Sequence, residues 1–222
     1  MSSRPTSVQV LFGEAKDGDF SPFSEGVADR RRELYAGPWA WNHQVHGAAV
    51  RSVSCPETID RNNGFAADAL VTTNSGIALS VVTADCAPVV FWSASGNGVA
   101  IAHAGWRGLV EGVLENTVQH LRKAGVDNIG AQLGPCIHPC CYEFGPELDA
   151  LVERYGEPVR GISSAASPSF DLPTAVDIAL TRVGVSVDHH TTHCTACAPT
   201  PYFSHRARAD RARLVSVVWI DR

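Results

Sequence analysis

Three residues that could hold a metal ion stand where predicted strands give way to turns: His46, Cys86 and His103. A catalytic zinc takes three protein ligands from His, Cys, Asp or Glu and keeps a fourth position for water. Each of the three lies in a short stretch rich in small residues (QVHG, TADC and HAGWRG), which the packing of a core does not require. The pattern favours a site at these strand ends over three buried side chains.

The same residues allow a second interpretation, in which Cys86 is a thiolate nucleophile and His103 or His46 is its general base. Asp85 could then orient the base, as the third member of a catalytic triad does. Both interpretations need a cysteine and a histidine within a few ångströms of each other. Spacing in the sequence therefore leaves both open.

The stretch HAGWRG adds a possible anion site, because a glycine-flanked turn leads into a predicted helix. The start of a helix offers free backbone N–H groups and a dipole that favours negative charge. Arg107 could also bind phosphate or carboxylate through its two-pronged guanidinium. In the alternative interpretation, Gly105 and Gly108 only shape the turn and Arg107 is solvated.

A second cluster of ligand-type residues lies in HHTTHCTACAP, between His189 and Pro199. The stretch holds His189, His190, His193, Cys194 and Cys197, enough ligands for a structural zinc. Such a site usually combines two distant ligand pairs, and the partners could come from Cys136, Cys140 and Cys141. A redox-active C-x-x-C is disfavoured, because no thioredoxin-like βαβ pattern surrounds it. A second metal here stays an open question.

Periodicity predicts the elements that position these residues. Strands are predicted at 8–12, 41–53 (bent at Gly47), 77–86, 88–92, 99–103, 129–137 and 214–220. Helices are predicted at 27–35 (capped by Ser24), 109–124 (ended by Gly125), 146–155 and 172–183 (capped by Asp171), with a long loop at 157–170. The strands at 77–86, 88–92 and 99–103 should form one antiparallel unit, because the turns between them are short. Strands and helices without strict βαβ alternation indicate the α+β class.

Composition and charge limit the class of protein, its partners and its compartment. The 222 residues, 45% hydrophobic and 18% charged, predict one soluble globular domain over residues 1–222. A net charge of −5 gives no basic field for nucleic acid or an anionic membrane. No signal-peptide pattern or membrane-length apolar run occurs, and the seven cysteines are odd in number, so a reducing cytoplasm is expected.

With these residues placed, the chain resembles the YfiH-like family, also called the laccase-domain or multicopper polyphenol oxidase family. The matching stretches are QVHG (Gln44–Gly47), ADALVT (Ala67–Thr72), TADCAPV (Thr83–Val89), HAGWRG (His103–Gly108), GPCIHPCCYEFG (Gly134–Gly145), and CT followed by YFSHR (Cys194–Arg206). TADC-x-P-V together with HAGWRG is highly specific for this family.

The resemblance implies a single α+β domain of packed β-sheets flanked by helices. It implies a zinc site at His46, Cys86 and His103, with copper as the alternative metal. It also implies phosphorolysis of adenosine, inosine, guanosine and methylthioadenosine, and deamination of adenosine, so that the partners are a nucleoside and phosphate. Two other activities stay open: copper-dependent oxidation of phenols, and cysteine-type hydrolysis of a peptidoglycan precursor.

For these reactions, we expect the substrate to be bound by Gln44, Arg107, Tyr142, Glu143 and Arg206. Deamination uses a zinc-activated hydroxide that attacks C6 of adenine, and a nearby carboxyl must shuttle protons. Asp85 and Glu143 are the candidates for that proton transfer. Phosphorolysis needs a bound phosphate, for which Arg107 and Arg206 are the candidates.

Overall fold

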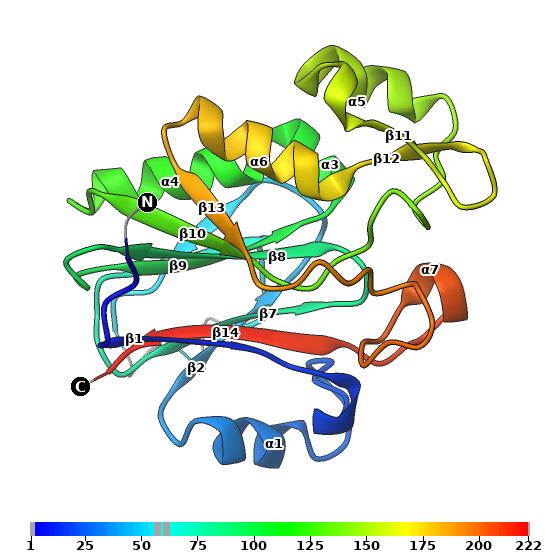
Figure 1. Cartoon of the computed structure of the whole chain (residues 1–222). Helices are drawn as coiled ribbons and strands as arrows, with labels where there is room; N and C mark the ends of the chain where they lie inside the picture. The colour runs from blue at the N-terminus through cyan, green and yellow to red at the C-terminus, as the bar shows by residue number, and fades with distance from the viewer. Residues whose placement is uncertain (1–2, 56–58, 60–62, 222) are drawn as a thin grey trace.

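Two β-sheets face each other at the centre of the molecule, and helices cover the outer side of each sheet (Figure 1). The computed structural model describes residues 3–55, 59 and 63–221. The resulting order of layers is helix, sheet, sheet, helix. The α+β class expected from the sequence is confirmed.

The larger sheet has six strands in the order β13-β10-β8-β9-β6-β4. Their bounds are β13 (Ser186–His189), β10 (Ile129–Leu133), β8 (Ala87–Ser93), β9 (Val99–Ala104), β6 (Ala69–Thr72) and β4 (Val50–Ser52). The predicted hairpin is confirmed, since β8 and β9 pair antiparallel with Ala87 opposite Ala104. Every residue of β8 and β9 is buried, because the facing sheet covers one side of these strands and helices cover the other.

The smaller sheet has four strands in the order β1-β14-β7-β2. Their bounds are β1 (Val8–Phe12), β14 (Leu214–Ile220), β7 (Ala78–Thr83) and β2 (Trp39–Ala40). The prediction that β7 pairs with β8 in one antiparallel unit was wrong, because β7 pairs with β14 and β2 instead. The chain therefore crosses from one sheet to the other between Thr83 and Ala87, where Asp85 adopts a positive φ of 92°.

Helices complete the two outer layers. Their bounds are α1 (Val27–Leu34), α3 (Trp106–Glu111), α4 (Val113–Lys123), α5 (Glu147–Tyr155), α6 (Leu172–Arg182) and α7 (His205–Arg208), with 3₁₀ turns at Ala15–Asp17 and Glu157–Val159. Helices α3, α4 and α6 lie over the six-stranded sheet, and α1 lies on the opposite side of the molecule (Figure 1). The single helix predicted over 109–124 divides at Gly112, whose φ of 89° ends α3 before α4 begins.

Apolar side chains fill the spaces between the layers. Leu79 of β7 and Ile101 of β9 belong to the cluster between the two sheets. Leu114 of α4 and Phe91 of β8 belong to the cluster under the helices. Burial on both faces of the large sheet holds its strand ends in fixed positions, which a site at those ends requires.

Other predicted elements differ in detail. The strand expected over 41–53 is two short strands, β3 (Asn42–His43) and β4, separated by a turn; β3 pairs with β5 (Phe65–Ala66). The loop expected at 157–170 contains the antiparallel pair β11 (Arg160–Ile162) and β12 (Pro168–Phe170). Gly26, not Ser24, precedes α1, because the Ser24 hydroxyl donates to the Asp19 and Ser21 carbonyls. Asp171 does cap α6, by accepting from the Thr174 N–H at 3.0 Å.

Within the described ranges, no helix is long and apolar enough to cross a membrane.

Candidate metal centre

His46, Cys86 and His103 meet at one end of the sheet sandwich. His46 comes from the turn between β3 and β4, Cys86 from the crossing between the two sheets, and His103 from β9. One ligand atom from each lies within 4.8 Å of the other two, and the two imidazole centroids are 4.8 Å apart. The structure thus brings together the three residues that the sequence singled out.

Asp68, which precedes β6, organises two of the three ligands. Its buried carboxylate lies 2.8 Å from Nδ1 of His103. The same carboxylate accepts backbone N–H groups from Val45, His46 and Gly47 at 3.1, 3.0 and 2.8 Å. These three bonds hold the turn in which His46 adopts a positive φ of 61°. A carboxylate behind a ligating histidine fixes which ring nitrogen faces the metal.

Asp68 was not among the residues predicted from the sequence. Asp85 was the residue predicted to orient a base, whereas Asp68 makes that contact with His103. The available signal was an aspartate directly before a buried strand, inside the matched stretch ADALVT. Its significance depends on contacts with residues far away in the sequence, which a local pattern does not reveal.

Two glycines let helix α3 approach the site. A Cβ at Gly105 would lie 3.0 Å from Cδ2 of His46 and 3.2 Å from Sγ of Cys86. A Cβ at Gly108 would lie only 2.8 Å from the carbonyl oxygen of Gly47. Neither glycine has a positive φ, so lack of space, not backbone conformation, requires glycine here.

The charges of Cys86 and His103 influence each other. Burial alone would raise the pKa of the Cys86 thiol, but the charge of His103 and hydrogen bonds from His103 and His46 outweigh burial and lower that pKa. Burial alone would lower the pKa of His103, but the Cys86 thiolate and the Asp68 carboxylate raise it. Without a metal, the protein therefore favours a thiolate beside an imidazolium.

The donor set fits a tetrahedral metal ion. Zinc–nitrogen and zinc–sulfur bonds of about 2.0–2.3 Å place ligand atoms about 3.3–3.8 Å apart, within the 4.8 Å limit seen for the trio. Asp68 occupies Nδ1 of His103, which leaves its Nε2 for the metal. Two imidazoles and a thiolate suit zinc or copper, and three ligands leave one coordination position for a water or a substrate.

A pocket of about 430 Å³ opens onto the trio. Its wall includes Gln44, Thr83, His205, Arg211 and Arg213 besides the three ligands. Among the described residues that line it, none carries a carboxylate, so apart from the Cys86 thiol its ionisable groups are histidines and arginines. The volume lies in the range typical of small-molecule sites.

Two groups in this pocket could bind a ligand. The Thr83 hydroxyl is buried and has no hydrogen-bond partner among the described residues. The exposed Arg211 guanidinium makes no hydrogen bond or ion pair within the part of the chain that the structure describes, whereas Arg213 donates to three backbone carbonyls. Buried polar groups are normally paired, so Thr83 is a candidate contact for a bound molecule.

The predicted substrate-binding residues divide between two locations. Gln44 lines the pocket, but its amide is held by the Val82 backbone, donating to the carbonyl and accepting from the N–H at 2.8 Å each. Glu143 and Arg206 line a smaller pocket of about 190 Å³ beside Trp106. Arg206 there donates to the Glu143 carbonyl at 2.9 Å.

The aromatic residues beside this smaller pocket stack with arginines. Tyr142 is buried under Arg206, whose guanidinium carbon lies 5.0 Å from the centre of the ring. Burial, and next the Cys86 thiolate, raise the pKa of Tyr142, which keeps the phenol protonated. Arg107 lies over the Trp106 ring at 4.3 Å and lines neither pocket.

Asp85 is buried, and its carboxylate points towards the C-terminal segment. It accepts from the Thr195 hydroxyl at 2.7 Å, the Ser204 hydroxyl at 3.0 Å and the Arg206 N–H at 2.7 Å. These bonds stabilise the unusual backbone of the sheet crossing and so position the adjacent Cys86.

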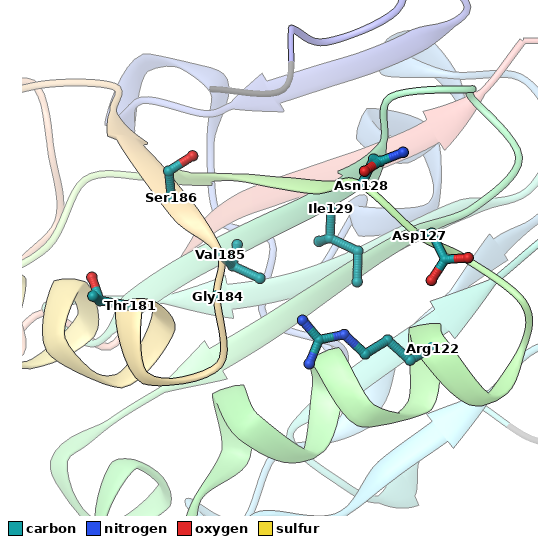
Figure 2. A pocket seen from close by; sticks show the side chains of 8 residues that line it. All are labelled: Arg122, Asp127, Asn128, Ile129, Thr181, Gly184, Val185 and Ser186. Carbon is teal, nitrogen blue, oxygen red and sulfur yellow. The ribbon is translucent and has the colours of Figure 1, made fainter.

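A larger pocket lies elsewhere, between the end of α4 and the start of β13 (Figure 2). It measures about 750 Å³, and Arg122 and Asp127 are its charged residues. No cysteine or histidine lines it, and Arg122 donates to the Val183 carbonyl at 2.6 Å. The described residues of its lining therefore offer no soft metal ligand.

The second cluster predicted from the sequence forms with cysteines alone. The structure brings together four thiols: Cys140, Cys141, Cys194 and Cys197. His189 does not join them, because its Nε2 lies 2.9 Å from an Asp177 carboxylate oxygen. His193 is exposed and also lies outside the group.

Comparison with known proteins matches the sequence of this chain to a family. Residues 24–221 match the family described as multi-copper polyphenol oxidoreductase laccase. A protein from Pseudomonas aeruginosa named purine nucleoside phosphorylase is 36% identical over 186 residues, covering 82% of this chain and 74% of that protein. A protein of the same name from Xylella fastidiosa is 37% identical, covering 81% of this chain and 71% of that protein.

Solved structures agree on the fold. The crystal structure of the Neisseria meningitidis protein NMB0706 superposes with a TM-score of 0.83 and 29% identity, covering 98% of this chain and 96% of that one. The crystal structure of the hypothetical protein YfiH from Bacillus licheniformis superposes with a TM-score of 0.84 and 22% identity, covering 96% and 93%. At that identity, the second likeness concerns the fold alone.

Proposed function

The chain belongs to the multi-copper polyphenol oxidoreductase laccase family, and from this premise we propose that it is a zinc-dependent purine nucleoside phosphorylase that also deaminates adenosine. The names of its relatives supply the reaction class. The observation that carries the proposal is a His–Cys–His metal trio that opens onto a pocket without carboxylates in its wall. Such a pocket can accept a nucleoside together with the phosphate anion.

Phosphorolysis converts a nucleoside and phosphate into the free base and ribose 1-phosphate. The phosphate carries negative charge, so its binding site needs cationic groups or strong donors. Arg211 meets that need, since its guanidinium is not engaged by other described residues. The Thr83 hydroxyl is available for the ribose or the base.

Deamination converts adenosine and water into inosine and ammonia. A zinc ion held by the trio would lower the pKa of a coordinated water. Asp68 orients His103 and the His46 turn, and Gln44 stays fixed on the Val82 backbone as part of the wall. Neither of the two carboxyls considered for proton transfer lines the pocket at the trio: three donors occupy both oxygens of Asp85, and Glu143 lines the smaller pocket and accepts from the Ser163 hydroxyl at 2.8 Å.

The test incubates protein of known metal content with adenosine, inosine, guanosine or methylthioadenosine, with and without phosphate. We expect free base and ribose 1-phosphate (5-methylthioribose 1-phosphate from methylthioadenosine) only when phosphate is present, and inosine from adenosine in either case. His103→Ala should abolish both reactions, whereas His120→Ala on α4 should abolish neither. A folded protein with bound zinc that yields none of these products would refute the proposal.

A cysteine hydrolase is the second candidate, and a specific arrangement favours it. Cys86, His103 and Asp68 stand in the order of nucleophile, base and orienting carboxylate. An amide of a peptidoglycan precursor would be the substrate. Amide hydrolysis that persists after complete zinc removal and stops on alkylation of Cys86 would support this reading over the metal-dependent one.

The family description favours a third candidate, a copper-dependent oxidase of phenols. Multicopper sites draw on many histidines, commonly in H-x-H pairs, and this sequence contains none of those pairs. Phenol oxidation that requires copper at the His46 trio, and is lost in His46→Ala, would support it.

A further inference from the structure

Four cysteine thiols from two loops form a second cluster on the other side of Asp85. Cys140 and Cys141 lie in the turn that follows β10, and Cys194 and Cys197 lie between β13 and α7. All four sulfur atoms are within 4.8 Å of one another, and Sγ of Cys197 lies 3.5 Å from Sγ of both Cys140 and Cys141. We propose that these four thiolates bind one zinc ion with a structural role.

The spacing of the sulfurs supports metal binding over disulfide formation. Four thiolates around a zinc at about 2.3 Å form a tetrahedron whose sulfur atoms are about 3.8 Å apart. A disulfide instead requires about 2.05 Å. The two 3.5 Å distances are close to a tetrahedral edge, and none of the four cysteines is joined in a disulfide. Tetrahedral sites with four sulfur ligands are typical of zinc.

The surroundings of the cluster resemble those of a structural metal site. Cys194 is buried, and the His138 N–H donates to its sulfur at 3.3 Å. Backbone donors of this kind stabilise and orient ligating groups from outside the coordination sphere. All four coordination positions would be filled by protein, so the site is closed, as expected of structural rather than catalytic zinc.

The two loops that supply the thiols also hold Asp85. The Ile137 N–H donates to the Asp85 carbonyl at 2.9 Å, and the Thr195 hydroxyl donates to its carboxylate at 2.7 Å. The Thr195 N–H donates to the Cys136 carbonyl at 3.1 Å and joins the loops directly. A zinc ion among the four cysteines would fasten both loops around the residue that precedes Cys86. This role does not depend on which reaction the first centre performs.

The test measures zinc by mass spectrometry in full-length protein without a polyhistidine tag. Wild-type protein and Cys55→Ser, the matched cysteine control, should contain two zinc ions per chain. Cys197→Ser should contain one, because Cys197 is an exposed ligand whose replacement leaves the core intact. Cys86→Ser should also contain one, so that failure of the first centre is distinguished from failure of this one.

X-ray absorption on the Cys86→Ser protein identifies the remaining ligands even if Cys197→Ser fails to fold. We expect four sulfur neighbours at about 2.3 Å. In folded Cys197→Ser, hydrogen exchange should become faster in residues 136–141 and 194–197 than in Cys55→Ser. The proposal is overturned if Cys86→Ser contains no zinc, if its remaining zinc has nitrogen or oxygen ligands, or if intact-mass analysis finds disulfides among the four cysteines.

Discussion

The carboxylate of Asp68 lies 2.8 Å from Nδ1 of His103, and both side chains are buried. This contact fixes the ring so that its other nitrogen faces His46 and Cys86. The same carboxylate binds three N–H groups of the His46 turn. One residue thus orients two of the three candidate metal ligands.

Asp68→Asn should weaken zinc binding at the first centre. An amide of the same shape loses the charge that stabilises the ring and the three N–H bonds. Loss of such an outer partner typically costs 10- to 100-fold in metal affinity. Competition with a chromogenic chelator measures the effect, and Asp188→Asn on the exposed face of β13 is the control. Unchanged affinity in a folded Asp68→Asn protein would contradict the organising role.

Gly105→Ala should reduce zinc content at the same centre without unfolding the protein. The added Cβ would lie 3.0 Å from the His46 ring and 3.2 Å from the Cys86 sulfur, and the backbone there accepts alanine. We expect partial loss of zinc with a melting temperature close to that of wild type after both are treated with chelator. Gly145→Ala is the matched control, because a Cβ at Gly145 would contact only the end of the flexible Glu147 side chain.

Cys86 should be readily alkylated in metal-free protein and protected by zinc. Burial would raise the pKa of its thiol, but His103 and His46 lower it below the ordinary 9.0. The thiolate therefore persists as pH falls to values at which an ordinary thiol is protonated. The midpoint of iodoacetamide reaction at the Cys86 peptide should lie below 9.0, measured against N-acetylcysteine. Equal reactivity with and without bound zinc would argue against Cys86 as a ligand.

Arg211→Gln should raise KM for phosphate, with a smaller effect on KM for the nucleoside. A hydrogen bond to a charged group contributes about 1.5–3 kcal/mol, which corresponds to about 10- to 100-fold in KM. Arg122→Gln removes an arginine from the larger pocket (Figure 2) and should leave both constants unchanged. An equal change in the two arginine variants would mean that net charge, not Arg211, is responsible.

Thr83→Val should raise KM for the nucleoside while stability stays equal or increases. Valine has nearly the shape of threonine, and the hydroxyl it removes is buried without a partner among the described residues. If the hydroxyl binds the substrate, its loss should change KM without lowering the stability of the folded protein. Thermal melting and steady-state kinetics on the same preparation measure both. A stable variant with unchanged KM would show that the hydroxyl does not contact the substrate.

The sequence predicted those parts of the site that depend on short, local stretches of residues. The sequence predicts each residue of the trio near the end of a strand, within a stretch rich in small residues, and strand ends are where a rigid sheet presents side chains. The β8–β9 hairpin was likewise visible as two apolar runs joined by a short turn that contains Gly96 and Gly98. The role of each ligand stays a prediction, because a grouping of donor atoms does not identify the ion that binds.

The missed features depend on contacts between distant segments. Alternation in β7 shows that it is a strand but not which sheet it joins, so its pairing with β14 could not be predicted. Asp68 acquires its role only when the His46 turn and β9 fold around it. The cysteines of two loops come together because β10 and β13 are neighbours, a parallel pairing that no local pattern specifies.

The crossing at Asp85 and Cys86 has a consequence for reading variant data. Cys86 lies in the crossing between β7 of one sheet and β8 of the other, so a shift between the sheets can move its sulfur relative to His103. Side chains packed between the sheets, such as Leu79 and Ile101, then influence ligand geometry from a distance. In a saturation mutagenesis screen, conservative changes at such positions would be scored as active-site lesions although they touch no ligand. Measuring both protein abundance and turnover for every variant would separate changes packed between the sheets from changes at the ligands themselves.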